Sequence, residues 1–317
     1  MNNNKATYPG HASMLVANML WGLMAPISKD SLIYFHEHGI SPFALAMMRM
    51  IGAAVSFWVL SLFVETQKTT WADRGKMFVA GMLSIVFNQC LFIVGVSYTT
   101  PLDASVVTTM LPILTMILAA IVLREPITGL KAVGVVTGMS GAIMLILGLG
   151  DGVQREVAAE GENSVVGNSM CFIAQICFAC YLVFFKNFIS RFNAVTLMRW
   201  MFGSAAVVIL PFAIPVLKDI DYAAIPMRTY LEIGYTVFVA TFFTYLLVPV
   251  GQRLLRPTVV SIYNYVQPVM SATVSYMWGM TTFGVAKGIA IALVFSGVYI
   301  VTQSKSRQQM ELEKKRQ

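Results

Sequence analysis

Polar side chains recur inside the long apolar stretches of this 317-residue chain, where an unpartnered polar atom is costly. They are amides, hydroxyls and large aromatic rings: Asn18, Trp21, Asn88, Gln89, Thr108, Thr109, Gln175, Thr244, Tyr245, Tyr263, Asn264, Tyr265 and Gln267. Taken singly, each is as consistent with a bond between neighbouring helices as with a role in binding. Their concentration at matching places in the two halves, beside Pro112 and Pro268, favours a shared cavity that holds a small polar molecule.

Four cations also fall within or beside apolar stretches. Arg49 and Arg199 lie inside them, where an ionised side chain is expensive and commonly functional. Because each lies near the start of its stretch, we expect structural anchoring first, by snorkelling to the headgroups or by pairing with helix ends, and substrate binding second. Lys29 and Lys186 lie near the ends of their stretches, so interfacial anchoring is again the first interpretation and a gate the second.

The residue types that catalysis needs are not grouped in the sequence. His11, His36 and His38 fall in the amino-terminal tail or the first external loop, away from any pair of carboxylates. The four cysteines lie in apolar stretches, and the C-x-x-C pair of Cys177 and Cys180 lacks the second ligand pair of a zinc site. We therefore expect no catalytic residue, no metal site and no cofactor.

The composition indicates the environment of these residues. Hydrophobic residues make up 57% of the chain and charged residues only 12%, against roughly 25% charged in a soluble domain. A helix needs ~20 apolar residues to cross a bilayer. Ten stretches meet this need: 12–34, 43–64, 77–98, 104–123, 130–149, 165–185, 194–216, 230–250, 258–278 and 284–301. The expected fold is an all-α integral membrane protein with ten transmembrane helices.

The two halves of the chain are related in sequence. A shift of 156 residues superposes Pro101 on Pro257, Ser105 on Ser261, Pro112 on Pro268, Lys131 on Lys287 and Gly141 on Gly297. A shift of 157 pairs Asn18 with Gln175, Trp21 with Phe178 and Lys29 with Lys186, and a shift of 150 pairs Arg49 with Arg199. Since each half has five stretches, an odd number, the second copy must enter the membrane from the opposite side. We expect inverted five-helix repeats at 1–150 and 151–303, followed by a basic cytoplasmic tail at 304–317.

Positive charge sets the expected orientation. If both termini lie on one side, that side holds most of the Lys and Arg residues, which places both termini in the cytoplasm. The net charge of +7 follows from these loops, and the sequence has no basic patch with interleaved aromatic residues that would bind nucleic acid. We expect a protein integral to the plasma (inner) membrane of a bacterium. Its partners are lipid and a small-molecule substrate, and a homodimer is compatible with the sequence.

Inverted repeats are typical of secondary transporters, in which two related gates flank a central site. The sequence therefore favours a permease or exporter that moves a small metabolite, such as an amino acid, by alternating access. The alternatives are a membrane-embedded enzyme and a nonspecific channel or scaffold.

The order of several short motifs resembles the EamA family of the drug/metabolite transporter superfamily. They are Trp21-Gly22 with Pro26 and Lys29, Ser41-Pro42 with Arg49, Pro112, and Leu123-Arg124-Glu125. The chain departs from the family pattern where Thr281 aligns with Glu125. The resemblance implies a drug/metabolite transporter fold and the export or uptake of small solutes.

Overall fold

The computed structural model describes residues 3–123, 129–146, 163–189, 191–254, 263–280 and 284–303. Every regular element in these ranges is helical. Several features discussed above lie outside the described residues: Arg124, Glu125, most of the linker between the halves, Pro257, Ser261, Thr281, the tail at 304–317 and the side chain of Tyr265.

The first half of the bundle contains α1 (Asn3–Glu37), α2 (Phe43–Leu60), α3 (Trp71–Gly81), the π-helix η1 (Met82–Phe87), α4 (Asn88–Tyr98), α5 (Pro101–Thr108), α6 (Leu111–Leu123) and α7 (Gly129–Ile146). Local signals mark the starts of two of these helices. Thr70 and Asp73 form a capping box before α3, and Asp103 N donates to Thr100 Oγ1 where Pro101 opens α5. The elements α3, η1 and α4 run on without a break as one long helix.

The second half contains α8 (Ser164–Phe184), α9 (Lys186–Ile189), α10 (Ala194–Lys218), the 3-10 turn η3 (Tyr222–Ala224), α11 (Met227–Gly234), the π-helix η4 (Tyr235–Phe243), α12 (Thr244–Leu254), the 3-10 turn η5 (Tyr263–Tyr265), α14 (Val266–Met277) and α15 (Val285–Gln303). Asn163 and Asn193 cap α8 and α10 by accepting from backbone N–H groups. Again α11, η4 and α12 form one continuous helix.

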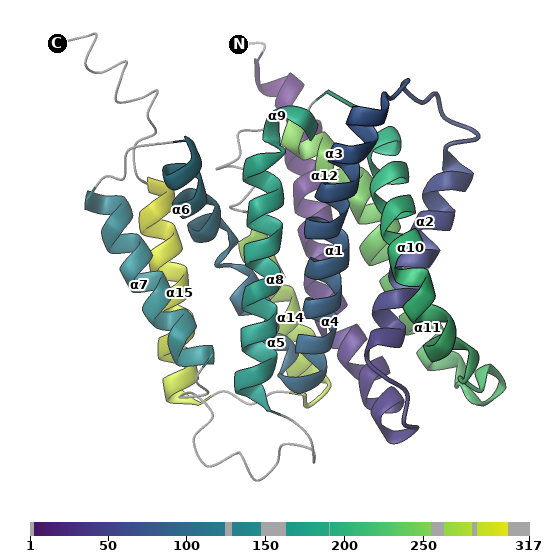
Figure 1. Ribbon diagram of the computed structural model, residues 1–317. Helices are drawn as coiled ribbons and strands as arrows, with labels where there is room; N and C mark the ends of the chain where they lie inside the picture. Colours follow the sequence, from purple (N-terminus) through teal and green to yellow (C-terminus); the bar gives the residue numbers. More distant parts are fainter. Residues whose placement is uncertain are drawn as a thin grey trace.

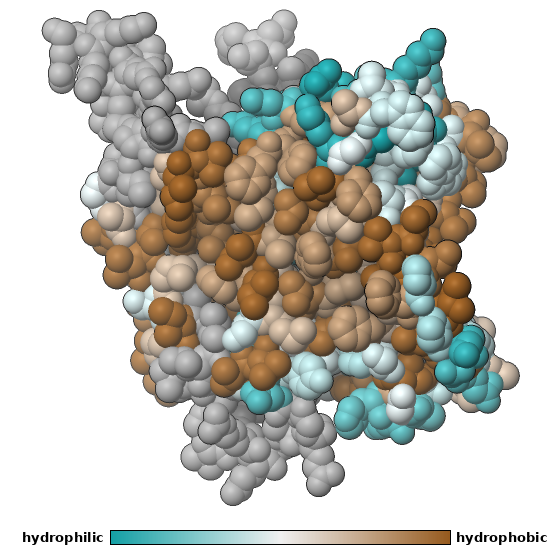
Figure 2. All heavy atoms as spheres, viewed as in Figure 1, coloured by the Kyte–Doolittle hydropathy of each residue, from teal (hydrophilic) through white to brown (hydrophobic). Residues whose placement is uncertain are grey.

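The surface of the bundle is suited to lipid. Figure 2 shows a band of apolar side chains across the middle of one face, with hydrophilic residues above and below it. Within the described residues, six helical segments are long and apolar enough to cross a membrane: Phe43–Leu60, Trp71–Tyr98, Pro101–Val122, Ser164–Phe184, Ala194–Lys218 and Met227–Leu254. The predicted all-helical integral membrane protein is therefore confirmed, while the count of ten spans stays a prediction.

Close helix pairs build the bundle. In Figure 1, α7 and α15 lie side by side at one edge and α2 and α10 at the other. Glycines permit the closest approaches: a Cβ on Gly95 of α4 would lie 2.8 Å from Gly167 O of α8, and a Cβ on Gly167 would lie 2.7 Å from Gly95 O. Gly138 and Gly297 make a similar backbone contact between α7 and α15. Small residues at such crossings are typical of helices packed in membranes.

Several predicted boundaries differ from the structure. The first helix extends back to Asn3 instead of starting at Ala12, so His11 lies in helix α1 and not in a free tail. The stretch 104–123 is interrupted at Thr109 and Met110, where α5 ends and α6 begins. Pro112 lies in the first turn of α6, and Pro268 likewise lies in the first turn of α14, after η5. A proline is tolerated there because the first turn needs no backbone donor.

Candidate functional site

A cavity of about 70 Å³ lies where the interrupted helices meet the bundle core. Its lining comes from both halves of the chain: Trp21, Met24, Arg49, Asn88, Gln89, Phe92, Thr108, Leu111, Gln175, Phe178, Tyr245, Asn264 and Gln267. Nine of these are among the candidates drawn from the sequence. The wall therefore combines amides, a hydroxyl, a cation and aromatic rings around one small space.

One side of the cavity is a chain of buried amides that joins three helices. Gln267 Nε2 on α14 donates to Asn18 Oδ1 on α1 at 2.7 Å, and it lies 3.5 Å from Asn264 Oδ1. Thr108 Oγ1 on α5 donates to Gln267 Oε1 at 3.1 Å. Asn18 does not line the cavity itself, but it fixes the Gln267 amide that does.

Another side is aromatic and is held by the π-helical segment η4. Trp21 Nε1 donates to Ala240 O at 3.0 Å, a carbonyl within η4, and its ring meets Tyr245 edge-on at 5.9 Å. Gln89 Nε2 lies 3.3 Å from Tyr245 OH, which donates in turn to Ser84 O. A π-helical turn shifts the hydrogen-bond ladder and frees backbone carbonyls, which is why such turns are common at functional sites.

Arg49 is the cation of the cavity wall. It comes from α2, is 2% exposed, and its Nε donates to Thr241 Oγ1 of η4 at 2.8 Å. Of the two forms of anchoring expected for this residue, snorkelling to the headgroups does not agree with its burial, because the guanidinium points inward to Thr241 and the cavity. The sequence position suggested snorkelling, but the neighbouring π-helix offers a buried hydroxyl that keeps the side chain inside.

The remaining candidates lie away from the cavity. Arg199 is half-buried between the rings of Trp58 and Trp200, at 5.3 and 5.5 Å, so the paired arginines differ in environment. Lys29 is buried and donates to Ser97 O at 3.0 Å, whereas Lys186 is exposed.

The other polar candidates outside the cavity have local partners. Thr109 and Thr244 donate to the carbonyls of Val106 and Val239 on their own helices. Tyr263 OH is hydrogen-bonded to His11 Nδ1 of α1 at 2.7 Å. These hydroxyls therefore support the helices around the cavity instead of lining it.

Several residues that line the cavity were not predicted from the sequence. The repeat pairs Phe178 with Trp21, and that pairing was sufficient to predict Phe178 as a lining residue. Met24, Phe92 and Leu111 are apolar residues in apolar helices, so no pattern separates them from core residues. Thr241, the partner of Arg49, lies one turn before Tyr245. It is a polar residue in the same apolar stretch as Thr244 and Tyr245, so the same reasoning could have identified it.

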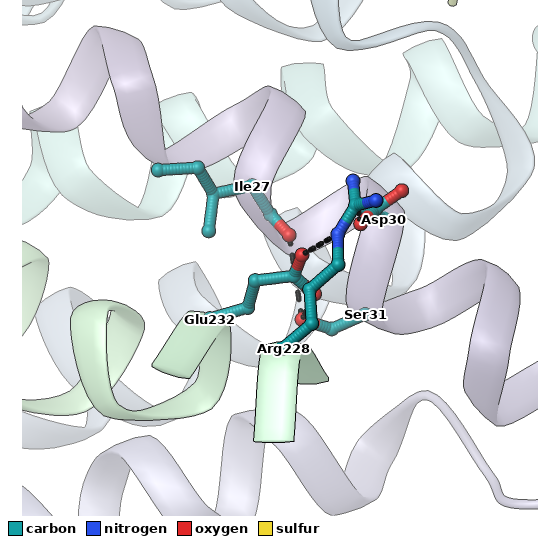
Figure 3. A network of polar contacts seen from close by, with 5 residues as sticks. All are labelled: Ile27, Asp30, Ser31, Arg228 and Glu232. Carbon is teal, nitrogen blue, oxygen red and sulfur yellow. Dashed lines mark hydrogen bonds and ion pairs between the residues drawn. The ribbon is translucent and has the colours of Figure 1, made fainter. Parts of the chain in front are cut away.

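A second polar cluster, at the far end of α1, joins α1 to α11 (Figure 3). Ser31 Oγ donates to Glu232 Oε2 at 3.0 Å, and Arg228 Nε donates to Glu232 Oε1 at 3.1 Å. A terminal nitrogen of Arg228 lies 2.7 Å from Asp30 Oδ2. Because the Arg228 side chain is 67% exposed and that of Glu232 only 8%, the cluster closes over a buried carboxylate from the solvent side.

Comparisons with known proteins agree with this architecture. "Uncharacterized transporter YyaM" of Bacillus subtilis is 23% identical over 288 residues, which is 90% of each chain. An "Uncharacterized transporter" of Archaeoglobus fulgidus is 27% identical over 192 residues, 61% of this chain and 63% of the relative. One solved crystal structure shares the fold, with a TM-score of 0.62 at 17% identity, and the match covers 95% of this chain and 98% of the other.

The model of the EamA-like transporter family matches residues 8–147 and again residues 165–303. The two matches together span most of both halves of the bundle. The chain therefore belongs to the EamA-like transporter family.

Proposed function

We propose that this membrane transporter is a secondary transporter that moves a small metabolite, such as an amino acid or a related solute, by alternating access. The observation that carries the proposal is the composition of the cavity wall. Four pairs of lining residues are related by the sequence repeat: Trp21 with Phe178, Gln89 with Tyr245, Thr108 with Asn264, and Leu111 with Gln267. A site shared by both repeats is where a transporter built from them binds its solute.

The packing of the helices supports inverted repeats of five helices, at 1–150 and 151–303. A two-fold axis relating the proposed repeats would exchange the helices that start at Asn3, Phe43, Trp71, Leu111 and Gly129 with those that start at Ser164, Ala194, Met227, Val266 and Val285. Under that exchange the contact of α1 with α12 becomes the contact of α8 with α4, and both contacts are extensive. The pairs α2 with α10 and α7 with α15 each join a helix to its own counterpart.

Irregular backbone occurs at matching places in the two halves and gives further support. The π-helices η1 and η4 interrupt equivalent helices, since a shift of 156 residues carries Met82–Phe87 into Tyr235–Phe243. The break between α5 and α6 corresponds in the same way to η5 before α14. Discontinuous helices at equivalent points of two repeats are a mark of transporter binding sites.

The cluster of Asp30, Ser31, Arg228 and Glu232 supports a closed outer gate in this state. With both termini in the cytoplasm of a bacterial cell, this end of α1 faces away from the cytoplasm. The ion pair between Arg228 and Asp30 and the hydrogen bond from Ser31 to Glu232 join α11 to α1, so opening the outer side requires both to separate. Exposed pairs contribute only ~0–1 kcal/mol each, which suits a gate that opens repeatedly.

The experiment combines metabolite profiling of cells with and without the protein and flux measurements in proteoliposomes. We expect Asn264→Ala to reduce flux of the identified solute without reducing stability, because the Asn264 amide faces the cavity. Thr273→Ala is the matched control, since Thr273 lies on the exposed face of α14 and bonds only Val269 O of its own helix.

Two results would contradict the proposal. One is the absence of any solute whose flux depends on the protein. The other is equal passage of unrelated solutes without saturation, which is the behaviour of a nonspecific channel.

A further inference from the structure

We propose that the cavity takes small metabolites that carry a carboxylate, and that Arg49 binds this carboxylate through its two terminal guanidinium nitrogens. The inference rests on the proposed transport function and adds the chemical class of the solute.

A hydrogen bond to η4 fixes the position of the Arg49 side chain. Its Nε is fixed by Thr241, whose own hydroxyl donates to Thr236 O at 2.7 Å within η4. This bond leaves the terminal nitrogens free to face the space that the side chain lines. Across the part of the chain that the structure describes, no carboxylate forms an ion pair with Arg49, and no acceptor bonds its terminal nitrogens.

That position has an energetic consequence. An uncompensated buried cation costs several kcal/mol, and buried charges in proteins are normally paired. A carboxylate matches the planar fork of arginine and accepts two parallel charge-assisted hydrogen bonds. A solute with this group would supply the charge that the surrounding helices lack, so binding the solute relieves a cost present in the empty cavity.

A neighbouring acceptor gives a second, independent observation. Gln89 Oε1 is buried with no hydrogen-bond partner among the described residues, although the side chain lines the cavity. Gln89 Nε2 bonds Tyr245 OH, and Arg49, Gln89 and Tyr245 all line the same cavity, so the unmatched acceptor and the unmatched donors belong to one site. An ammonium or hydroxyl group next to the carboxylate would satisfy Gln89.

The rings of Trp21, Phe92, Phe178 and Tyr245 form the apolar part of the wall. They favour a solute with a short hydrocarbon body over a purely ionic one such as inorganic phosphate.

Arg199 serves as the internal control. It is the repeat counterpart of Arg49 by sequence, but it stacks on Trp58 and Trp200 and does not line the cavity. An arginine at this repeat-related position is therefore not sufficient by itself to form a carboxylate site.

The test measures thermal stabilisation of the full-length protein in detergent by matched probes. One set is glycine, acetate and methylamine; a second is L-alanine, propanoate and ethylamine; glucose and inorganic phosphate complete the panel. We expect the acids and amino acids to bind and the amines and glucose not to bind. Arg49→Lys should weaken binding by about 10- to 100-fold, the size expected when charge-assisted bonds are lost. Arg49→Gln should abolish binding, while Arg199→Gln should bind as the unaltered protein does.

Specific outcomes would overturn the inference. They are equal binding of amines and acids, tighter binding of phosphate than of any carboxylate, or unchanged affinity in Arg49→Lys. If no probe binds, the test uses the transported solutes that metabolite profiling identifies. A transported solute without a carboxylate then refutes the assignment of Arg49. In each of these cases flux can still be measured, and the proposed function fails only if no solute depends on the protein for its flux or if unrelated solutes pass equally and without saturation.

Discussion

The contact between Gly95 and Gly167 provides a sensitive test of the packing that positions the cavity. The two glycines lie where α4 crosses α8, and these helices carry Asn88, Gln89 and Gln175 of the cavity wall. Asn88 Nδ2 donates to Ala174 O at 2.8 Å across the same crossing. We expect Gly95→Ala to destabilise the protein and to reduce flux, because a methyl group cannot enter without separating the two helices.

The magnitude follows from the distances. A Cβ on Gly95 would lie 2.6 Å from Cys171 Sγ and 2.8 Å from Gly167 O, and the latter is backbone that cannot rotate away. Since ordinary contacts need about 3.5 Å or more, the helices must separate by roughly 0.5–1 Å. Overpacking of this kind costs about 1–3 kcal/mol. The double variant Gly95→Ala with Gly167→Ala should cost less than the sum of the single changes, because both strain the same crossing.

The assay is reversible unfolding in mixed micelles, with flux in proteoliposomes measured in parallel. The control is Gly75→Ala, because Gly75 is an exposed helical residue of α3 with no atom within 4 Å of the position of a new Cβ. There the better helix propensity of alanine should stabilise the protein by up to about 1 kcal/mol. A Gly95→Ala protein as stable as the unaltered protein would refute the close approach of α4 and α8.

Three further predictions test other parts of the structure. Gln267→Leu should destabilise the protein by about 1–3 kcal/mol in the same unfolding assay, because it leaves buried polar partners unsatisfied; a loss below about 0.5 kcal/mol would contradict the buried network. Asp30→Asn should increase labelling of a cavity cysteine by an impermeant reagent added outside, since it removes the ion pair with Arg228 that joins α1 to α11 at the proposed outer gate. Unchanged labelling would argue against that gate. Single cysteines at Ser164 and Gly129 should be labelled from outside and inside respectively, and labelling of both from outside intact cells would exclude the inverted arrangement.

Much of the fold was predictable because the bilayer imposes a simple length rule. The starts at Phe43 and Ala194 and the end at Tyr98 agree with the structure, since each follows or precedes turn residues that interrupt an apolar run. The family was also predictable from motif order, and the family match confirms it. The extension of α1 back to Asn3 was not, because its first turns are polar and precede the apolar run from which the helix was predicted.

The kinds of residue in the candidate site were predictable from the sequence, but which of the polar residues line the cavity was not. Polar residues at repeat-related positions, such as Gln89 with Tyr245 and Thr108 with Asn264, do line one cavity. The sequence could not separate these from Thr109 and Thr244, which bond carbonyls of their own helices. One residue along a helix rotates a side chain by about 100°, so adjacent polar residues face different neighbours, and small errors in helix phase exchange their roles.

By itself, the sequence determined that the chain is a helical membrane protein with two related halves, because hydropathy and repetition are properties of the order of residues. The tertiary structure decided which polar groups meet. It turned Arg49 inward to Thr241, held Arg199 between two tryptophans, and joined Asp30 to Arg228 across nearly two hundred residues. The physical reason is that a buried charge takes its partner from whichever helix packs beside it, and the π-helical and broken segments that set this packing have no local sequence signature.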